Sequence, residues 1–149
     1  MKQINPLNLI AGFLVALSTF AFADNKPRLE GYCLVCYHDA GKAVKGSPEF
    51  ATTHGDNLFY FPSAEAKAKF DKNPAKYYPE YNGYCAHAMA DGRKVEIDPT
   101  AFSLVNNKLY FNYDHKVKAK FDADQQGFIE KADKEWAKMQ KKMAVDKKG

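Results

Sequence analysis

The sequence predicts an α+β fold: a small single domain of two pseudo-repeated hairpin-plus-helix units with a C-terminal amphipathic helix. Three observations predict it. An apolar amino-terminal stretch lies outside the folded part, the rest of the chain contains a repeat, and its last segment has apolar residues at helical spacing. The remaining length suits one domain with a modest core.

The amino-terminal stretch has the features of a secretory signal. Lys2 provides a positive start, the apolar run 7–22 follows, and Ala21-Phe22-Ala23 is the small-x-small pattern at which signal peptidase cleaves. The run is shorter than the roughly 20 residues that a membrane-spanning helix needs. We therefore expect residues 1–23 to be a cleaved signal peptide. We expect residues 24–149 to form a periplasmic or secreted domain with no membrane span after cleavage.

The repeat relates two halves of this domain. Leu58-Phe-Tyr-Phe61 aligns with Leu109-Tyr-Phe-Asn112, and Lys67-Ala-Lys-Phe-Asp71 aligns with Lys118-Ala-Lys-Phe-Asp122, both at an offset of 51 positions. With a slip of one residue, Gly31-Tyr-Cys33 aligns with Gly83-Tyr-Cys85. We interpret this as an internal duplication, with half-units at about 31–82 and 83–126.

In the first half-unit, strands are predicted at 50–53 and 58–61 on either side of a His-Gly-Asp-Asn turn. Ser63 is then expected to cap a helix that runs to about Lys72, where Asn73-Pro74 stops it.

The second half-unit repeats this order. Strands are predicted at 102–105 and 108–113 around Asn106-Asn107, and Asp114 is the expected cap of the matching helix. A last amphipathic helix is predicted at about 127–145 from apolar residues at helical spacing. These residues are Phe128, Ile129, Ala132, Trp136, Met139 and Met143.

The charge pattern excludes one class of partner. The formal net charge is +4, and lysines are spread along the chain, most densely after Lys116. A mild basic excess on helical stretches is typical of a solvated face. We therefore expect no binding of nucleic acid.

The reactive side chains concentrate in the two repeated cysteine segments. If the halves pack about a pseudo-twofold axis, four donors meet at one point: Cys33, Cys36, Cys85 and His87. Three thiolates and an imidazole form a tetrahedral soft-metal site, for which copper as Cu(I) is preferred and zinc is the alternative. Met89 is a further candidate ligand that favours copper. The predicted function is metal storage, delivery to a partner protein or detoxification, with no enzymatic activity.

Other interpretations of the cysteines stay open. Cys33 and Cys36 have the spacing of a redox dithiol, which could act together with Cys85. A structural disulfide between Cys33 or Cys36 and Cys85 is the third interpretation. A Cys85 and His87 hydrolase is disfavoured because no third orienting group is in view. The remaining imidazoles have no paired ligand and are expected to be surface or hydrogen-bonded side chains: His38, His54 and His115.

The chain also resembles a known family. Phe59-Tyr-Phe-Pro-Ser63, with Asn73-Pro-Ala-Lys-Tyr77 behind it, resembles the YHS domain, a module associated with heavy-metal handling. Pro79-Glu-Tyr-Asn-Gly-Tyr-Cys-Ala86 and Leu109-Tyr-Phe-Asn-Tyr113 are similar to exported bacterial YHS-domain proteins. Those usually have Gly-Tyr-Asp-Pro-Val-Ala-Tyr where this chain has Gly31-Tyr-Cys-Leu-Val-Cys-Tyr37. Metal-linked YHS domains carry a Cys-x-x-Cys there, so the resemblance implies metal binding.

Overall fold

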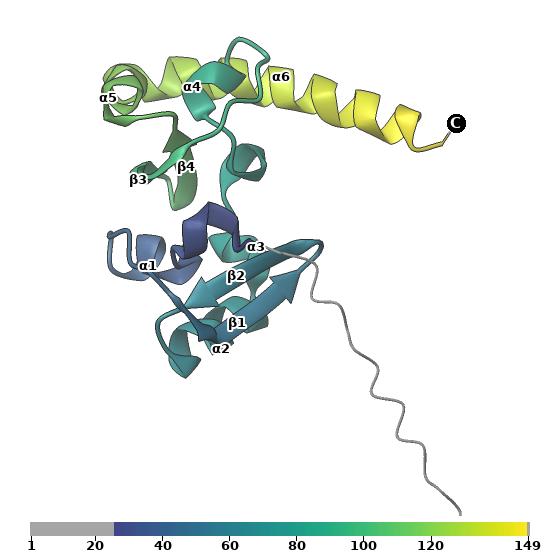
Figure 1. Ribbon diagram of the computed structural model, residues 1–149. Coiled ribbons are helices and arrows are strands. Elements are labelled where there is room, and N and C mark those ends of the chain that lie inside the picture. Colours follow the sequence, from purple (N-terminus) through teal and green to yellow (C-terminus); the bar gives the residue numbers. More distant parts are fainter. Residues whose placement is uncertain (1–25, 149) are drawn as a thin grey trace, which may run out of the picture.

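In the computed structural model, which describes residues 26–148, the chain builds two half-units that lie one above the other (Figure 1). The first half-unit contains η1 (Arg28–Gly31), α1 (Leu34–Asp39), β1 (Ser47–His54), β2 (Asn57–Phe61), α2 (Ala64–Lys72) and α3 (Pro74–Tyr77). The second contains η2 (Glu80–Gly83), α4 (Ala86–Met89), β3 (Asp98–Val105), β4 (Lys108–Asn112), α5 (His115–Ala123) and α6 (Gln125–Asp146). The predicted α+β class is confirmed, and no helix among residues 26–148 is long and apolar enough to cross a membrane.

The two hairpins repeat each other in detail. Each is antiparallel, and each has a register shift in its first strand, between Ser47 and Ala51 in β1 and between Asp98 and Phe102 in β3. In the second hairpin, Asn106 and Asn107 have φ of 50° and 63°, the left-handed pair that a tight hairpin turn requires. The strands begin earlier than the sequence predicts because their first residues pair across these bulges.

The helices that follow the hairpins are capped as predicted. Ser63 accepts a hydrogen bond from the backbone N–H of Ala66 at 3.2 Å, and Asp114 accepts one from Val117 at 2.7 Å. Each N-cap satisfies one of the backbone donors that a helix leaves free at its start.

Side-chain bonds between strand and helix are repeated too. The Thr52 hydroxyl donates to Asp71 at 2.7 Å in the first half-unit, and the Ser103 hydroxyl donates to Asp122 at 2.7 Å in the second. The pseudo-repeat therefore extends from backbone to side-chain hydrogen bonds.

A left-handed turn precedes each cysteine segment. Leu29 and Glu30 have φ of 53° and 51°, and their counterparts Tyr81 and Asn82 have 54° and 53°. Residues other than glycine rarely adopt this backbone conformation, and the sequence has glycine only at the third position of each turn. Composition therefore did not predict these turns, although the repeated glycines mark where they end.

The half-units differ after their second helix. Asn73 and Asp124 each cap the next helix, by accepting from Lys76 and Gly127. In the first half-unit the helix stops after one turn, because Pro79 disfavours helical backbone in the residue before it. In the second, α6 continues to Asp146 and, as Figure 1 shows, extends past the rest of its half-unit.

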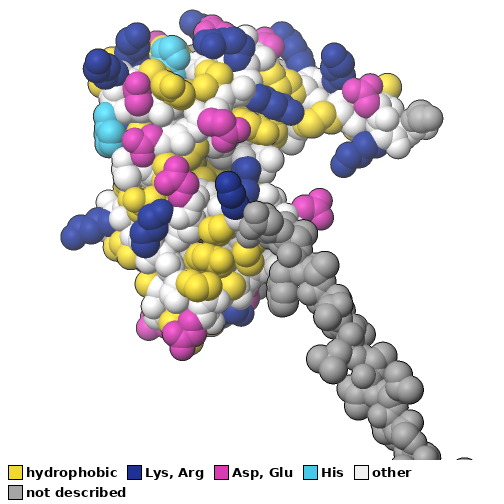
Figure 2. Space-filling model, viewed as in Figure 1, with side chains coloured by type: hydrophobic (Ala, Val, Ile, Leu, Met, Phe, Trp, Pro, Cys, Tyr) yellow, Lys and Arg dark blue, Asp and Glu magenta, His cyan; other side chains and the backbone are white. Residues whose placement is uncertain are grey.

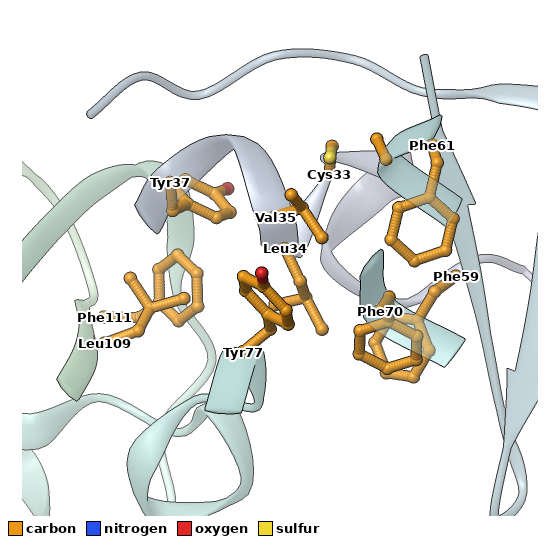
Figure 3. Packing of buried hydrophobic residues seen from close by; sticks show 11 residues of the cluster. Cys33, Leu34, Val35, Tyr37, Phe59, Phe61, Phe70, Tyr77, Leu109 and Phe111 are labelled. Carbon is orange, nitrogen blue, oxygen red and sulfur yellow. The ribbon is translucent and has the colours of Figure 1, made fainter. Parts of the chain in front are cut away.

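Charged side chains of both signs are scattered over the face of the two half-units that Figure 2 shows. The interior is aromatic and spans both halves (Figure 3). The fully buried Tyr37 ring of α1 lies 4.7 Å from Phe102 and 5.1 Å from Phe111, both in the second half-unit. The Tyr37 hydroxyl donates to the carbonyl of Pro99 at 2.8 Å. The first core thus includes residues of the second hairpin.

A second core lies beneath α6. Met89 of α4, Phe121 of α5 and Ala132 of α6 are all 0% exposed there. Trp136 and Met139, both partly buried, pack against this cluster. The predicted packing face of α6 is confirmed from Phe128 to Met139, whereas the predicted Met143 is 37% exposed.

Candidate functional site

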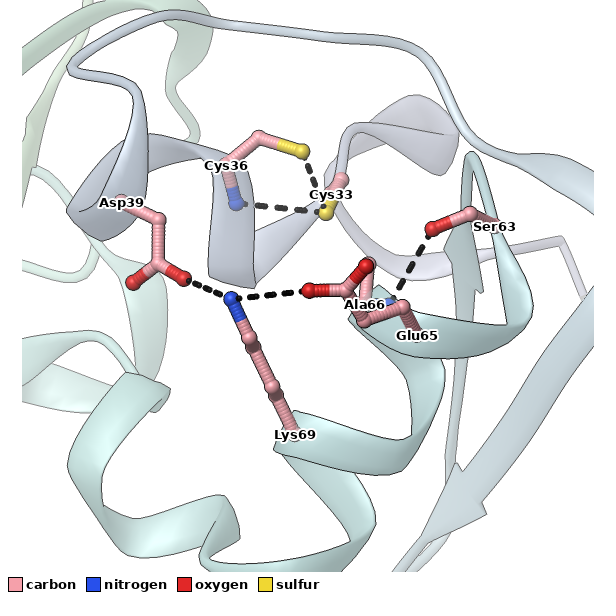
Figure 4. A network of polar contacts seen from close by, with 7 residues as sticks. All are labelled: Cys33, Cys36, Asp39, Ser63, Glu65, Ala66 and Lys69. Carbon is pink, nitrogen blue, oxygen red and sulfur yellow. Dashed lines mark hydrogen bonds and ion pairs between the residues drawn. The ribbon is translucent and has the colours of Figure 1, made fainter.

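Cys33 and Cys36 form a close pair of thiols at the start of α1 (Figure 4). The Cys36 thiol donates to the Cys33 sulfur, with 2.9 Å between the two Sγ atoms. The Cys33 sulfur also accepts from the backbone N–H of Cys36 at 3.2 Å, so it serves as the N-cap of the helix. All three cysteines of the chain are free thiols.

The local fold buries Cys33 completely and Cys36 only in part. The backbone N–H of Cys33 donates to the carbonyl of Val44 at 2.8 Å, which fixes the start of α1 against the following loop. Leu34 and Tyr37 point into the first core at 0% exposure, and so does Cys33. Cys36 lies on the remaining side of this turn and is half-buried. Solvent and partners therefore reach the pair through Cys36.

The surroundings of the pair hold Cys33 protonated. Burial raises the pKa of the Cys33 thiol to about 12, and the hydrogen bond from the Cys36 side chain acts in the same direction. Next to the pair, Lys69 of α2 bridges two carboxylates, Asp39 at 2.9 Å and Glu65 at 3.4 Å (Figure 4). These hydrogen bonds raise the pKa of Lys69, so the ammonium stays charged. This exposed bridge ties α1 to α2 beside the thiols.

Cys85 occupies the equivalent place in the other half-unit. Its backbone N–H donates to the carbonyl of Val95 at 3.0 Å, and its sulfur caps α4 by accepting from Ala88 at 3.5 Å. The residue is 1% exposed, and its thiol donates to the side-chain oxygen of Asn112 at 3.8 Å. The repeat thus gives Cys33 and Cys85 the same structural role at two separate positions.

The structure does not bring the four predicted ligands together. Within residues 26–148, no group of three or more His, Cys, Asp or Glu side chains could hold a metal ion. The predicted Cys33, Cys36, Cys85 and His87 cluster is therefore not formed, nor is a disulfide to Cys85.

The reason lies in how the halves pack. Helix α1 packs against α2, α3 and β2, whereas α4 packs against α5, α6 and β4. Figure 1 accordingly shows α1 in the lower half-unit and α4 in the upper one. The long α6 has no counterpart in the first half-unit, and it packs against α4 in the second.

The other two predicted ligands have packing roles. The His87 ring stacks on Phe128 with 4.5 Å between ring centroids, and Met89 is fully buried in the second core. A Met89 sulfur enclosed by apolar side chains is typical of a gap-filling core residue.

The remaining histidines differ from one another. His115 shares a hydrogen bond of 2.9 Å with Thr100, as expected of an exposed imidazole. His54 packs edge-on against Phe70 at 5.9 Å. His38 differs from the prediction, because both its ring nitrogens are buried without a hydrogen-bond partner and burial lowers its pKa.

Sequence reasoning missed Asn112. This residue is 0% exposed, and its side-chain oxygen also accepts from the backbone N–H of His87 at 3.3 Å, while its Nδ2 has no partner. The aligned position of the first half-unit is Phe61, so a polar residue in place of a core aromatic ring was the available signal. Cys85 and His87 also line a cavity of about 290 Å³, together with Arg93 and Tyr113.

Comparisons with protein families, with curated proteins and with solved structures found no match to this chain. The resemblance to the YHS domain therefore stays a prediction that depends on the motifs alone. What the fold and the site define is an α+β protein with an accessible vicinal dithiol in one half-unit and an isolated buried thiol in the other.

Proposed function

We propose that Cys33 and Cys36 bind one Cu(I) ion, and that the protein stores copper outside the cytoplasm or delivers it. The observation that carries this proposal is the contact of two free thiol sulfurs, 2.9 Å apart, one of which belongs to the half-buried Cys36. Thiolate sulfur is the donor that Cu(I) selects. The resemblance to metal-linked YHS domains and the predicted signal peptide support the same function.

The number of donors favours copper over zinc. Structural zinc sites are almost always tetrahedral and take four protein ligands. Within residues 26–148, no third His, Cys, Asp or Glu side chain is in reach of the pair. A soft ion that accepts two thiolates suits this site, so zinc is the weaker candidate.

The position of the pair suits transfer of the ion. Two sulfurs that alone hold one ion lie on nearly opposite sides of it, so at about 2.3 Å from the ion they are roughly 4–4.6 Å apart. The 2.9 Å separation therefore has to widen, and Cys36 can widen it by rotating its half-buried side chain. A receiving thiolate could approach from the same side, because only Cys36 faces outward.

Acid should weaken this binding. A thiolate binds metal only after it loses its proton, and the pKa of Cys33 is raised to about 12. Below that value the ion must displace the Cys33 proton, so affinity falls continuously as pH decreases.

A competition titration tests the proposal. The fully reduced chain is titrated with Cu(I) against a chromogenic chelator, alongside Cys33→Ser, Cys36→Ser and the matched control Cys85→Ser. We expect one tightly held Cu(I) per chain in the wild type and in Cys85→Ser, and a loss of at least about 100-fold in affinity in the other two variants. Equal affinity in all four proteins would show that the pair is not the site.

Thiol-disulfide exchange is the second candidate, and the contact of the sulfurs favours it. In this reaction the Cys36 thiolate attacks a disulfide of a partner protein, and one partner sulfur leaves as a thiolate. The Cys33 thiolate then displaces the second partner sulfur, so the partner gains two electrons and Cys33–Cys36 becomes a disulfide. The raised pKa of Cys33 slows this second step.

Rapid turnover of a model disulfide by the metal-free protein, lost in Cys36→Ser, would favour exchange. Absence of turnover together with one bound Cu(I) would favour metal binding.

A further inference from the structure

Helix α6 (Gln125–Asp146) carries a basic stripe that the dithiol does not account for. The stripe consists of Lys131, Lys134, Lys138, Lys141 and Lys142, all of them exposed. At 3.6 residues per turn, these positions fall within an arc of about 100° and extend for about 16 Å along the helix. The lysines are therefore concentrated on one face rather than scattered around the helix.

The basic stripe faces away from the body of the protein. Ala132 is buried in the second core, and Trp136 and Met139 pack against that core. At about 3.6 residues per turn, these three residues lie on the side of the helix opposite the lysines. Figure 2 shows lysine and arginine side chains recurring along the upper edge of the molecule, where α6 runs in Figure 1. The stripe thus forms part of the outer edge of the second half-unit.

The charges of the stripe are mostly uncompensated. Lys138 pairs with Glu135 at 2.6 Å, and within residues 26–148 no other lysine of the stripe has a carboxylate within 4.0 Å. Like charges at spacings of three and four residues destabilise a helix. A shallow groove of about 420 Å³ runs beside them, with Lys131, Lys134, Lys138 and Lys141 in its lining. A ligand with several negative charges would relieve this repulsion.

One apolar side chain lies on the same face. Val145 falls within the arc of the lysines, one turn beyond Lys141, and is 70% exposed. The apolar face of α6 packs on the second core, so contact with lipid would rest on the charge of the lysines, with a small apolar contribution from Val145. Lysine stems can then cover apolar surface while their ammonium groups reach the phosphates.

We propose that the basic stripe of α6 docks the protein on an anionic lipid surface. The lysines contact headgroup phosphates, and Val145 enters the boundary with the acyl chains. A lipid surface presents many phosphates side by side, which suits a row of lysines that extends for about 16 Å along one face of a helix. This docking is independent of the dithiol and of any bound metal.

Vesicle sedimentation tests the proposal with the full chain. Wild type is compared on vesicles of phosphatidylglycerol with phosphatidylcholine and on phosphatidylcholine alone, so any contribution of the amino-terminal stretch is common to all samples. We expect at least about tenfold stronger binding to the anionic vesicles, lost in high salt. Equal binding to both vesicle types would overturn the proposal.

Two variants and a matched control locate the contact. Changing all five lysines of the stripe to Gln should remove the preference for anionic vesicles, and changing them to Arg should keep it. The control alters the same charge elsewhere, at Lys26, Lys42, Lys72, Lys108 and Lys116, and should lose less than about threefold. An equal loss in control and stripe variants would overturn the proposal. So would binding to polyglutamate but not to vesicles, which would identify an acidic protein partner instead.

Discussion

Removal of the Tyr37 hydroxyl tests whether its hydrogen bond to the second half-unit stabilises the fold. Tyr37→Phe keeps the ring against Phe102 and Phe111 but removes the hydrogen bond to Pro99, which is 2.8 Å long and buried. The Pro99 carbonyl then has no donor in an apolar environment. Loss of such a bond costs about 1–2 kcal/mol, which corresponds to roughly 3–10 °C in Tm for a domain of this size.

Urea unfolding followed by circular dichroism measures this cost. Tyr113→Phe is the matched control, because Tyr113 is 54% exposed and its substitution should change the free energy of unfolding by less than about 0.5 kcal/mol. Both variants should unfold in one transition, since the two half-units share the first core. If Tyr37→Phe were as stable as Tyr113→Phe, the bond across the half-units would not contribute to stability, and this description of the interface would fail.

Three further predictions follow from burial and backbone contact. In the native state, a thiol reagent should modify Cys36 quickly and modify Cys33 and Cys85, which are 0–1% exposed, slowly. All three should react at the same rate in urea, and equal rates in the native state would contradict the assigned burial. Gly46→Ala should lower the free energy of unfolding in urea by about 3 kcal/mol, because the added Cβ would overlap backbone atoms of Tyr60 and Phe61. Gly41→Ala should lower it by about 1 kcal/mol, because only its φ of +61° is unfavourable. A loss in Gly46→Ala no greater than that in Gly41→Ala would refute the close contact. Burial raises the pKa of Cys33 and of Tyr110 to about 12, so the stability they contribute is complete below their unfolded values near 9 and 10 and is lost as pH rises toward 12; unfolding free energies that stay constant from pH 8 to pH 11 would contradict this.

The elements that sequence predicted best are those set by local rules. Ser63 and Asp114 cap helices because their side chains reach a backbone N–H three residues on, and Asn106-Asn107 turns because asparagine tolerates positive φ. The repeat itself was visible because the same hairpin and helix need the same residues twice. None of these features depends on how the halves pack.

The elements that sequence missed depend on tertiary packing. The short helices α1 and α4 are too brief to show apolar periodicity, and each is held by a core that forms only after folding. The proximity of Cys33 to Cys36 follows from their spacing within one helical turn. The separation of Cys85 from this pair does not follow from sequence spacing, because it depends on α6 covering one half-unit and not the other.

The coordination of bound copper tests the proposed function most directly. X-ray absorption at the copper edge, on protein loaded with one equivalent of Cu(I), reports the number and type of atoms bound to the ion. Binding by Cys33 and Cys36 predicts two sulfur neighbours and no imidazole, unchanged in Cys85→Ser. A third sulfur or an imidazole nitrogen that disappears in Cys85→Ser or His87→Ala would show that the two cysteine segments meet at one ion, and would contradict a site confined to α1.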